Sequence, residues 1–152
     1  MLQRSQTLIL LGVFILSLLM LTGPLSRYTM DGAELILKHS GLFDADGEKM
    51  ALVAWPMTVL FTTVVVLTFM NIFFYRHRMR QMRIATFLIL LNAGMIGMMF
   101  FYTFVAGNQL EDPLTMHQWR FVLPPINMIL LYFAFRRIRR DELLVKAFDR
   151  IR

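Results

Sequence analysis

Four long apolar segments of the chain are almost free of charged residues, and nearly every charge falls between them. A helix that crosses the hydrocarbon core of a bilayer needs about 20 mostly apolar residues. Apolar residues make up 57% of the chain and charged residues 17%, whereas a soluble domain has about 25% charged residues. The pattern predicts one domain over residues 1–152, an all-α membrane protein with a four-helix transmembrane bundle. Its spans are expected at residues 7–24, 50–75, 84–106 and 116–135.

The first apolar segment has a competing interpretation as a signal peptide. Arg4 provides a basic start, and residues 8–21 form a hydrophobic region. A signal peptide also needs small residues at its cleavage site, and Thr22-Gly23-Pro24 does not supply that pattern. The segment is therefore interpreted as a retained span.

The fourth segment contains Pro124-Pro125. A helix from the prolines to Phe135 would have about 12 residues and a length of about 18 Å, too short to span a bilayer. We therefore expect this helix to begin near Met116 and to bend at the prolines.

Lys and Arg are distributed unequally between the two sides of the predicted bundle. The side with both termini and the loop at residues 76–83 holds 12 of them, and the other side holds 4. Cytoplasmic loops carry the excess of Lys and Arg, so both termini are predicted to be cytoplasmic, in a bacterial inner membrane. These residues lie at the ends of apolar segments, where they meet lipid head groups. The net charge of +6 therefore does not indicate a nucleic-acid partner.

The outer loop, residues 25–49, contains Asp31-Gly32 between two β-compatible runs. An Asp-Gly pair in that setting favours a two-residue β-hairpin. An irregular loop, or a short helix over residues 33–39, is the alternative.

The tail, residues 136–152, has apolar residues at helical spacing and many basic ones. It is predicted to be a basic amphipathic cytoplasmic helix that lies on the inner leaflet or docks onto a protein partner. The residues expected to make that contact are Arg136, Arg137, Arg139, Arg140, Lys146 and Phe148.

Three asparagines, Asn71, Asn92 and Asn127, fall one in each of the last three spans. A side-chain amide in a membrane interior forms interhelical hydrogen bonds, so these residues are predicted to join neighbouring helices. A shared ligand or quinone site is the alternative role. Gly94 and Gly97, with Ala93, form a small face that favours close helix packing on the third span.

The residues that carry chemistry are scarce. The chain has no cysteine, which excludes disulfides and thiolate metal sites. His39, His77 and His117 lie in or beside loops, which disfavours a haem site within the bundle. Pumps and coupled transporters place charged groups at membrane depth, and none is expected here. We predict no catalytic residue, cofactor or metal site and no enzyme activity. A zinc site formed by His39, His117 and an Asp, and a calcium loop at residues 44–48, are weaker alternatives.

Two terminal motifs suggest a family. The chain opens with Met1-Leu2-Gln3-Arg4-Ser5-Gln6-Thr7-Leu8 and closes with Ile138-Arg139-Arg140-Asp141-Glu142-Leu143-Leu144-Val145-Lys146 and then Asp149-Arg150-Ile151-Arg152. In these motifs, and over essentially its whole length, it resembles a family of small four-span membrane proteins of Bacteroidota-type bacteria, domain of unknown function 4293. The resemblance implies this fold and location but no activity or ligand.

The function predicted from these features is that of a non-enzymatic accessory or scaffold subunit of an inner-membrane complex. Its expected partners are membrane lipids and either another membrane protein or further copies of itself. A lipid- or quinone-binding protein is the alternative, with its cleft near Asn127 and the bent fourth helix.

Overall fold

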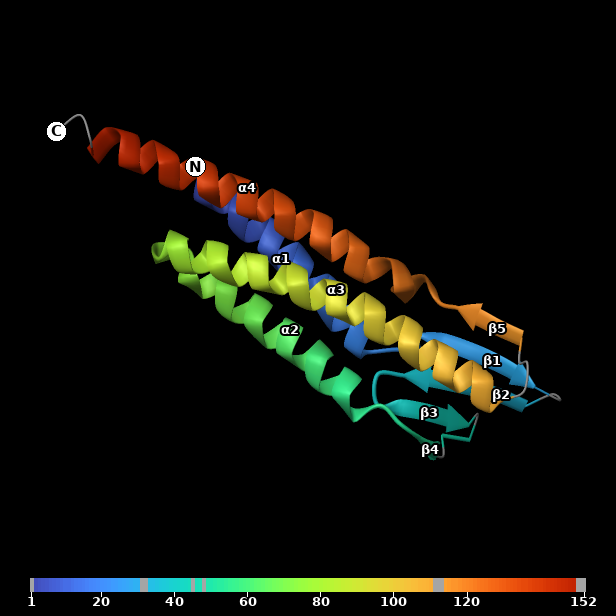
Figure 1. Ribbon diagram of the computed structural model, residues 1–152. Coiled ribbons are helices and arrows are strands. Elements are labelled where there is room, and N and C mark those ends of the chain that lie inside the picture. Colours follow the sequence, from blue (N-terminus) through green and yellow to red (C-terminus); the bar gives the residue numbers. More distant parts are fainter. Residues whose placement is uncertain (1, 31–32, 45, 48, 111–113, 150–152) are drawn as a thin grey trace.

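The structure is a computed structural model that describes residues 2–30, 33–44, 46–47, 49–110 and 114–149. A bundle of long helices carries a small β-sheet at one end, and the start of α1 and the end of α4 lie toward the other end (Figure 1). The helices are α1 (Leu2–Leu21), α2 (Trp55–Phe73), α3 (Arg78–Gln109) and α4 (Leu123–Asp149), with short 3-10 turns at η1 (Phe74–Arg76) and η2 (Trp119–Val122). The strands are β1 (Ser26–Met30), β2 (Ala33–Lys38), β3 (Gly41–Asp44), β4 (Lys49–Val53) and β5 (Leu114–His117).

Three helical segments of the described chain are long and apolar enough to cross a membrane: Trp55–Phe73, Arg78–Asn108 and Trp119–Leu144. A shorter apolar helix covers Thr7–Leu21. The prediction of a mostly helical fold with helices of membrane-spanning length is therefore confirmed.

The four helices pack in sequence order around a common core. α1 lies beside α2 and α4, and α3 lies beside α2 and α4. Buried residues recur at alternating intervals of three and four, which is the spacing that keeps one face of a helix toward its neighbours in a left-handed bundle. On α2 this face consists of Met57, Phe61, Val64, Thr68 and Asn71. On α3 it consists of Gln81, Ala85, Leu88, Asn92, Met95, Met99, Tyr102 and Ala106. On α4 it includes Asn127, Leu131, Ala134, Ile138 and Asp141, and on α1 Leu10, Val13, Ser17 and Met20.

The sheet has five strands in the order β4-β3-β2-β1-β5, and every pair is antiparallel. Met30 pairs with Ala33, so β1 and β2 form the predicted two-residue hairpin, whose turn residues 31–32 lie outside the described residues. The alternative of a short helix over residues 33–39 is wrong. The strands β3, β4 and β5 enlarge this hairpin into a sheet that the sequence did not predict.

The sheet packs against the end of α3. With 32 residues, α3 is about 48 Å long, well beyond the roughly 30 Å of the hydrocarbon core, and its last turns run alongside the sheet (Figure 1). The Tyr28 hydroxyl donates a hydrogen bond of 3.2 Å to the main-chain oxygen of Thr103. Alternate side chains of the sheet are buried beside this bond, among them Tyr28, Leu35 and Leu37. The extension of α3 thus anchors the sheet.

Two predicted span boundaries are wrong because strands replace the expected helix. Residues 50–53 belong to β4, and α2 begins only at Trp55. Met116 and His117 belong to β5 rather than to a helix. Both strands complete the sheet: β4 pairs with β3, which precedes it in the chain, and β5 pairs with β1, which lies far from it in the sequence.

The predicted bend in the fourth helix is also wrong. α4 begins at Leu123, so Pro124-Pro125 lie in its first turn, where a missing N–H leaves no hydrogen bond unmade. The helix is long because it does not stop at Phe135. It continues through the basic segment to Asp149, 27 residues in all or about 40 Å.

The contact between the sheet and α3 is tested by Tyr28→Phe. The change leaves the ring in place but removes the buried hydroxyl that bonds to Thr103, so unfolding should become easier by about 1 kcal/mol. Thermal unfolding in detergent measures the effect. Tyr132→Phe serves as the control because Tyr132 is exposed. Equal stability of both variants would contradict the assigned role of the hydrogen bond.

Candidate functional site

Asn127 joins α4 to α1. Its Nδ2 donates a hydrogen bond of 3.1 Å to Ser17 Oγ, and Ser17 Oγ in turn donates to the main-chain oxygen of Val13 at 2.8 Å. Both Asn127 and Ser17 are buried. The predicted cleft near Asn127 depended on a bent fourth helix, which the structure does not have. Asn127 is instead a packed interhelical contact.

The other two asparagines are placed differently. Asn92 Nδ2 donates to the main-chain oxygen of Leu88 within its own helix at 2.8 Å. Neither amide atom of Asn71 has a hydrogen-bond partner among the described residues, although its main-chain oxygen accepts a bond of 3.3 Å from Gln81 Nε2. Both side chains are fully buried. Among the described residues, neither the Asn71 nor the Asn92 side chain therefore forms the predicted hydrogen bond between helices.

The basic segment after Phe135 is part of α4. Ile138 and Asp141 continue the buried face of the helix, and Arg78 Nη1 donates to the main-chain oxygen of Asp141 at 3.0 Å. The first part of the tail is therefore docked onto α3 and is not a separate helix on the membrane surface. The exposed arginines of this part are Arg136, Arg137, Arg139 and Arg140. The side chains of Lys146 and Phe148 lie outside the described residues.

His39 lies in the turn between β2 and β3 and joins the sheet to the helices. Thr58 Oγ1 donates to the main-chain oxygen of His39 at 2.9 Å, and His39 Nδ1 lies 3.2 Å from the same Oγ1. Because the single hydroxyl hydrogen goes to the carbonyl, Nδ1 acts as the donor in the second contact. Burial lowers the pKa of His39 below its ordinary 6.5, opposed by a hydrogen bond with the backbone of Leu21 and assisted by the charge of Lys38.

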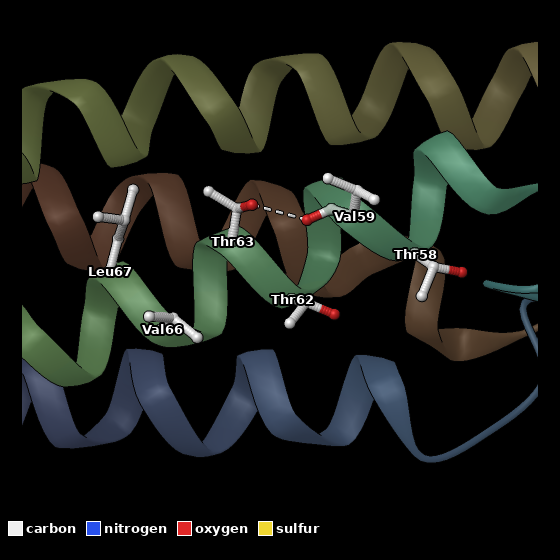
Figure 2. Close-up of a pocket in the computed structure, with 6 residues that line it drawn as sticks. All are labelled: Thr58, Val59, Thr62, Thr63, Val66 and Leu67. Atoms are coloured by element: carbon white, nitrogen blue, oxygen red, sulfur yellow. Dashed lines mark hydrogen bonds between the residues drawn. The ribbon is translucent and has the colours of Figure 1, made fainter.

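A groove runs along the outer face of α2. It has a volume of about 380 Å³ and is lined by Thr58, Val59, Thr62, Thr63, Val66 and Leu67. In Figure 2, α1 and α3 pass on either side of α2, and α4 lies behind it. Thr63 Oγ1 donates to the main-chain oxygen of Val59 at 2.7 Å, as the dashed line shows. The groove is therefore an outward surface lined mostly by short side chains, within a helix long and apolar enough to span a membrane.

This groove was not predicted from the sequence. Its signal was the run of β-branched residues from Thr62 to Val66 in a chain whose spans are otherwise rich in Phe, Leu and Met. Short branched side chains on the outside of a helix leave space between the larger side chains that flank them.

The predicted small face of α3 points outward. Ala93, Gly94 and Gly97 are exposed, and a Cβ added at either glycine would meet nothing within 4 Å. The prediction that this face serves close packing is therefore wrong for the helices of this chain.

The structure also bears on the alternative metal sites. Among the described residues, no group of three or more His, Cys, Asp or Glu side chains is placed to hold a metal ion. His39 contacts Thr58, whereas the His117 ring packs edge-on against Phe121 with centroids 4.9 Å apart.

The model of a protein family described as domain of unknown function (DUF4293) matches residues 2–151. The chain belongs to this family. The resemblance noted in the terminal motifs is thereby confirmed, and the DUF4293 match covers all four helices and the sheet. No curated protein matches the chain.

The low pKa of His39 makes the junction between sheet and helices sensitive to acid. The unfolded junction takes up a proton more readily than the folded one, so folding favours the neutral imidazole. Its contribution is complete above the unfolded pKa of 6.5 and is lost as the pH falls through the lower folded value. Hydrogen exchange of the main chain at residues 38–42 and 54–58, corrected for the intrinsic rate, should therefore accelerate between about pH 7.5 and pH 5.

His39→Gln should remove this pH dependence because glutamine does not titrate, and His77→Gln should retain it. The same acceleration in His39→Gln would show that another group is responsible.

Proposed function

We propose that this protein is a non-enzymatic accessory or scaffold subunit of a bacterial inner-membrane complex, and that the groove on α2 receives a transmembrane helix of its partner. The observation that carries the proposal is the groove of about 380 Å³ on the outward face of a helix able to span. Small side chains at membrane-helix interfaces allow two backbones to approach closely, which strengthens dispersion contacts between them.

The hydroxyl groups of the groove support a helix as its occupant. The Thr58 and Thr63 hydroxyls bond to main-chain oxygens of His39 and Val59. The exposed Thr62 hydroxyl forms no such bond with another residue of the described chain. In hydrocarbon, a hydroxyl gains about 0.6–2 kcal/mol from a hydrogen bond across a helix pair. Thr62 is thus suited to meet a polar side chain or main-chain oxygen of a neighbouring helix.

The proposed topology has four spans with both termini in the cytoplasm. α1 has 20 residues, which give about 30 Å of helix, and it packs beside α2 and α4. The start of α1, the connection between α2 and α3, and the end of α4 lie away from the sheet (Figure 1). Within the described residues, these parts and the first turns of α3 carry 10 of the 16 Lys and Arg residues of the chain, which supports a cytoplasmic position for that end.

Cysteine labelling tests this topology, because the chain has no cysteine of its own. Asp46 near the sheet and Arg140 at the other end are both exposed. In cells whose inner membrane is intact, an impermeant maleimide should label Asp46→Cys. It should leave Arg140→Cys unlabelled until the inner membrane is permeabilised. The reverse pattern would refute the proposed orientation, and labelling of both in sealed cells would refute the span count.

A photo-crosslinker at position 62 tests the proposed role of the groove. Thr62 and Ile129 are both exposed, one on α2 and the other on α4, within segments able to span. A leucine-sized diazirine amino acid at position 62, which is smaller than phenylalanine and leaves room in the groove, should give a discrete adduct with one other membrane protein, whereas the same residue at position 129 should give none. Thr62→Phe should fill the groove and lower recovery of that partner about tenfold, a loss equivalent to about 1.4 kcal/mol.

Ile129→Phe is the matched control and should leave recovery unchanged. Identical adducts from positions 62 and 129, or none from either, would contradict the proposal. An adduct with the same chain would mean that the groove joins copies of this protein.

A lipid-like molecule is the alternative occupant, because the lining of the groove combines apolar side chains with three threonines. Native mass spectrometry separates the two cases. A single stoichiometric lipid or quinone that persists in the wild type and is lost in Thr62→Phe, without any protein adduct, would favour this alternative.

A further inference from the structure

Three buried amide oxygens of the bundle have no hydrogen-bond partner among the described residues. One is Oδ1 of Asn71 at the end of α2. The other two are Oδ1 of Asn92 on α3 and Oδ1 of Asn127 on α4, and both of these residues are 0% exposed. The Nδ2 atom of each of these two amides is already bonded, to Leu88 in one case and to Ser17 in the other. Each residue therefore presents one unpaired acceptor and no free contact with solvent.

Two contacts set the register of α3 against α4. Near one end, Arg78 Nη1 bonds to the main-chain oxygen of Asp141. Near the other end, the ring of Phe100 on α3 meets that of Phe121, which lies in η2 directly before α4, with centroids 5.7 Å apart. Because the helices are antiparallel neighbours, residues between these contacts pair in reverse order.

This register places Asn92 and Asn127 at the same level of the bundle. Asn92 follows Arg78 by 14 residues, and Asn127 precedes Asp141 by 14 residues. The same count pairs Leu88 with Leu131 and Ala85 with Ala134, all of them buried. Helices in contact have axes about 8–10 Å apart, so inward side chains at one level lie within direct or single-water reach. The two amides thus form one polar level of the bundle, next to the apolar levels of Leu88 with Leu131 and Ala85 with Ala134.

We propose that Asn92 and Asn127 hold one buried water molecule between their Oδ1 atoms. An unpaired buried acceptor is costly, and a buried water needs about two to four polar partners. A water has two hydrogens to donate, which matches the two unpaired acceptors. A bound metal cation would need about six oxygen ligands, more than the acceptors available at this level. Two acceptors therefore suit a small neutral molecule that donates two hydrogen bonds, such as water.

The bound water links three helices. Asn127 already connects α4 to Ser17 of α1, and the water extends this connection to Asn92 of α3. Sliding α3 by one turn against α4 would move the two amides to different levels and leave both oxygens unpaired. A single polar level in an apolar bundle can fix the register of helices in this way.

A double-mutant cycle tests the proposal. Asn92→Leu and Asn127→Leu should each lower the midpoint of thermal unfolding in detergent, because each leaves the water and the remaining oxygen short of a partner. The double variant should lose less than the two single losses combined, by at least about 2–4 °C. Asn71→Leu with Asn127→Leu is the control, since Asn71 packs beside Gln81 near the end of α2 and its loss should be additive.

An experimental structure at a resolution that shows ordered water provides the second readout. Density for one water within hydrogen-bond distance of both Oδ1 atoms in the wild type, absent in the double variant, is the expected result. Additive losses for the Asn92 and Asn127 pair would overturn the proposal. So would a direct bond between the two amides, which would explain coupling without water.

Discussion

The packing of α3 against its neighbours is the contact on which the rest of the structure depends. In hydrocarbon every main-chain N–H and C=O must be satisfied within the helix, so helices can only be joined through their side chains. α3 has buried residues from Gln81 to Ala106 and lies beside α2, α4 and the sheet. Its 32 residues exceed the thickness of the hydrocarbon core. One helix therefore holds both the membrane bundle and the sheet.

The same repeat of buried residues explains why the helices extend past the apolar segments. Gln81 at the start of α3 and Asp141 near the end of α4 are buried although both are polar. They occupy positions of the repeat that leucine or alanine fill elsewhere. The contact of Arg78 with Asp141 closes the bundle at the end opposite the sheet. The core is thus set by spacing along the helix and not by hydrophobicity alone.

The sequence was sufficient to predict the helical class and the β1–β2 hairpin, because both arise from local patterns. Apolar segments of span length indicate helices, and Asp31-Gly32 between β-compatible runs indicates a hairpin. The ends of α3 and α4 were misjudged because charged residues were taken as boundaries. Arginine is a good helix former, and the segments from Arg78 and after Phe135 remain helical. Charge in these segments therefore does not mark the ends of the helices.

The strands β3, β4 and β5 could not be predicted for a different reason. Each has four or five residues, too few for a clear alternation of apolar and polar side chains. Moreover, β5 pairs with β1 across most of the chain, so its partner is not visible locally. The asparagines show an intermediate case. Their spacing places them in the core, but their level relative to other helices follows only from the contacts at the two ends of α3 and α4.

The outward glycines of α3 bear on what the exterior of the bundle is for. A glycine within a helix costs about 1 kcal/mol relative to alanine, and a Cβ at Gly94 or Gly97 would meet nothing within 4 Å. No contact within the described chain offsets that cost. The groove on α2 is likewise outside the core, since α1 and α3 flank it without covering it (Figure 2). The interior polar residues serve the fold of the single chain. The short side chains on the exterior of α2 and α3 do not, and their physical reason must be sought in whatever packs against them in the membrane.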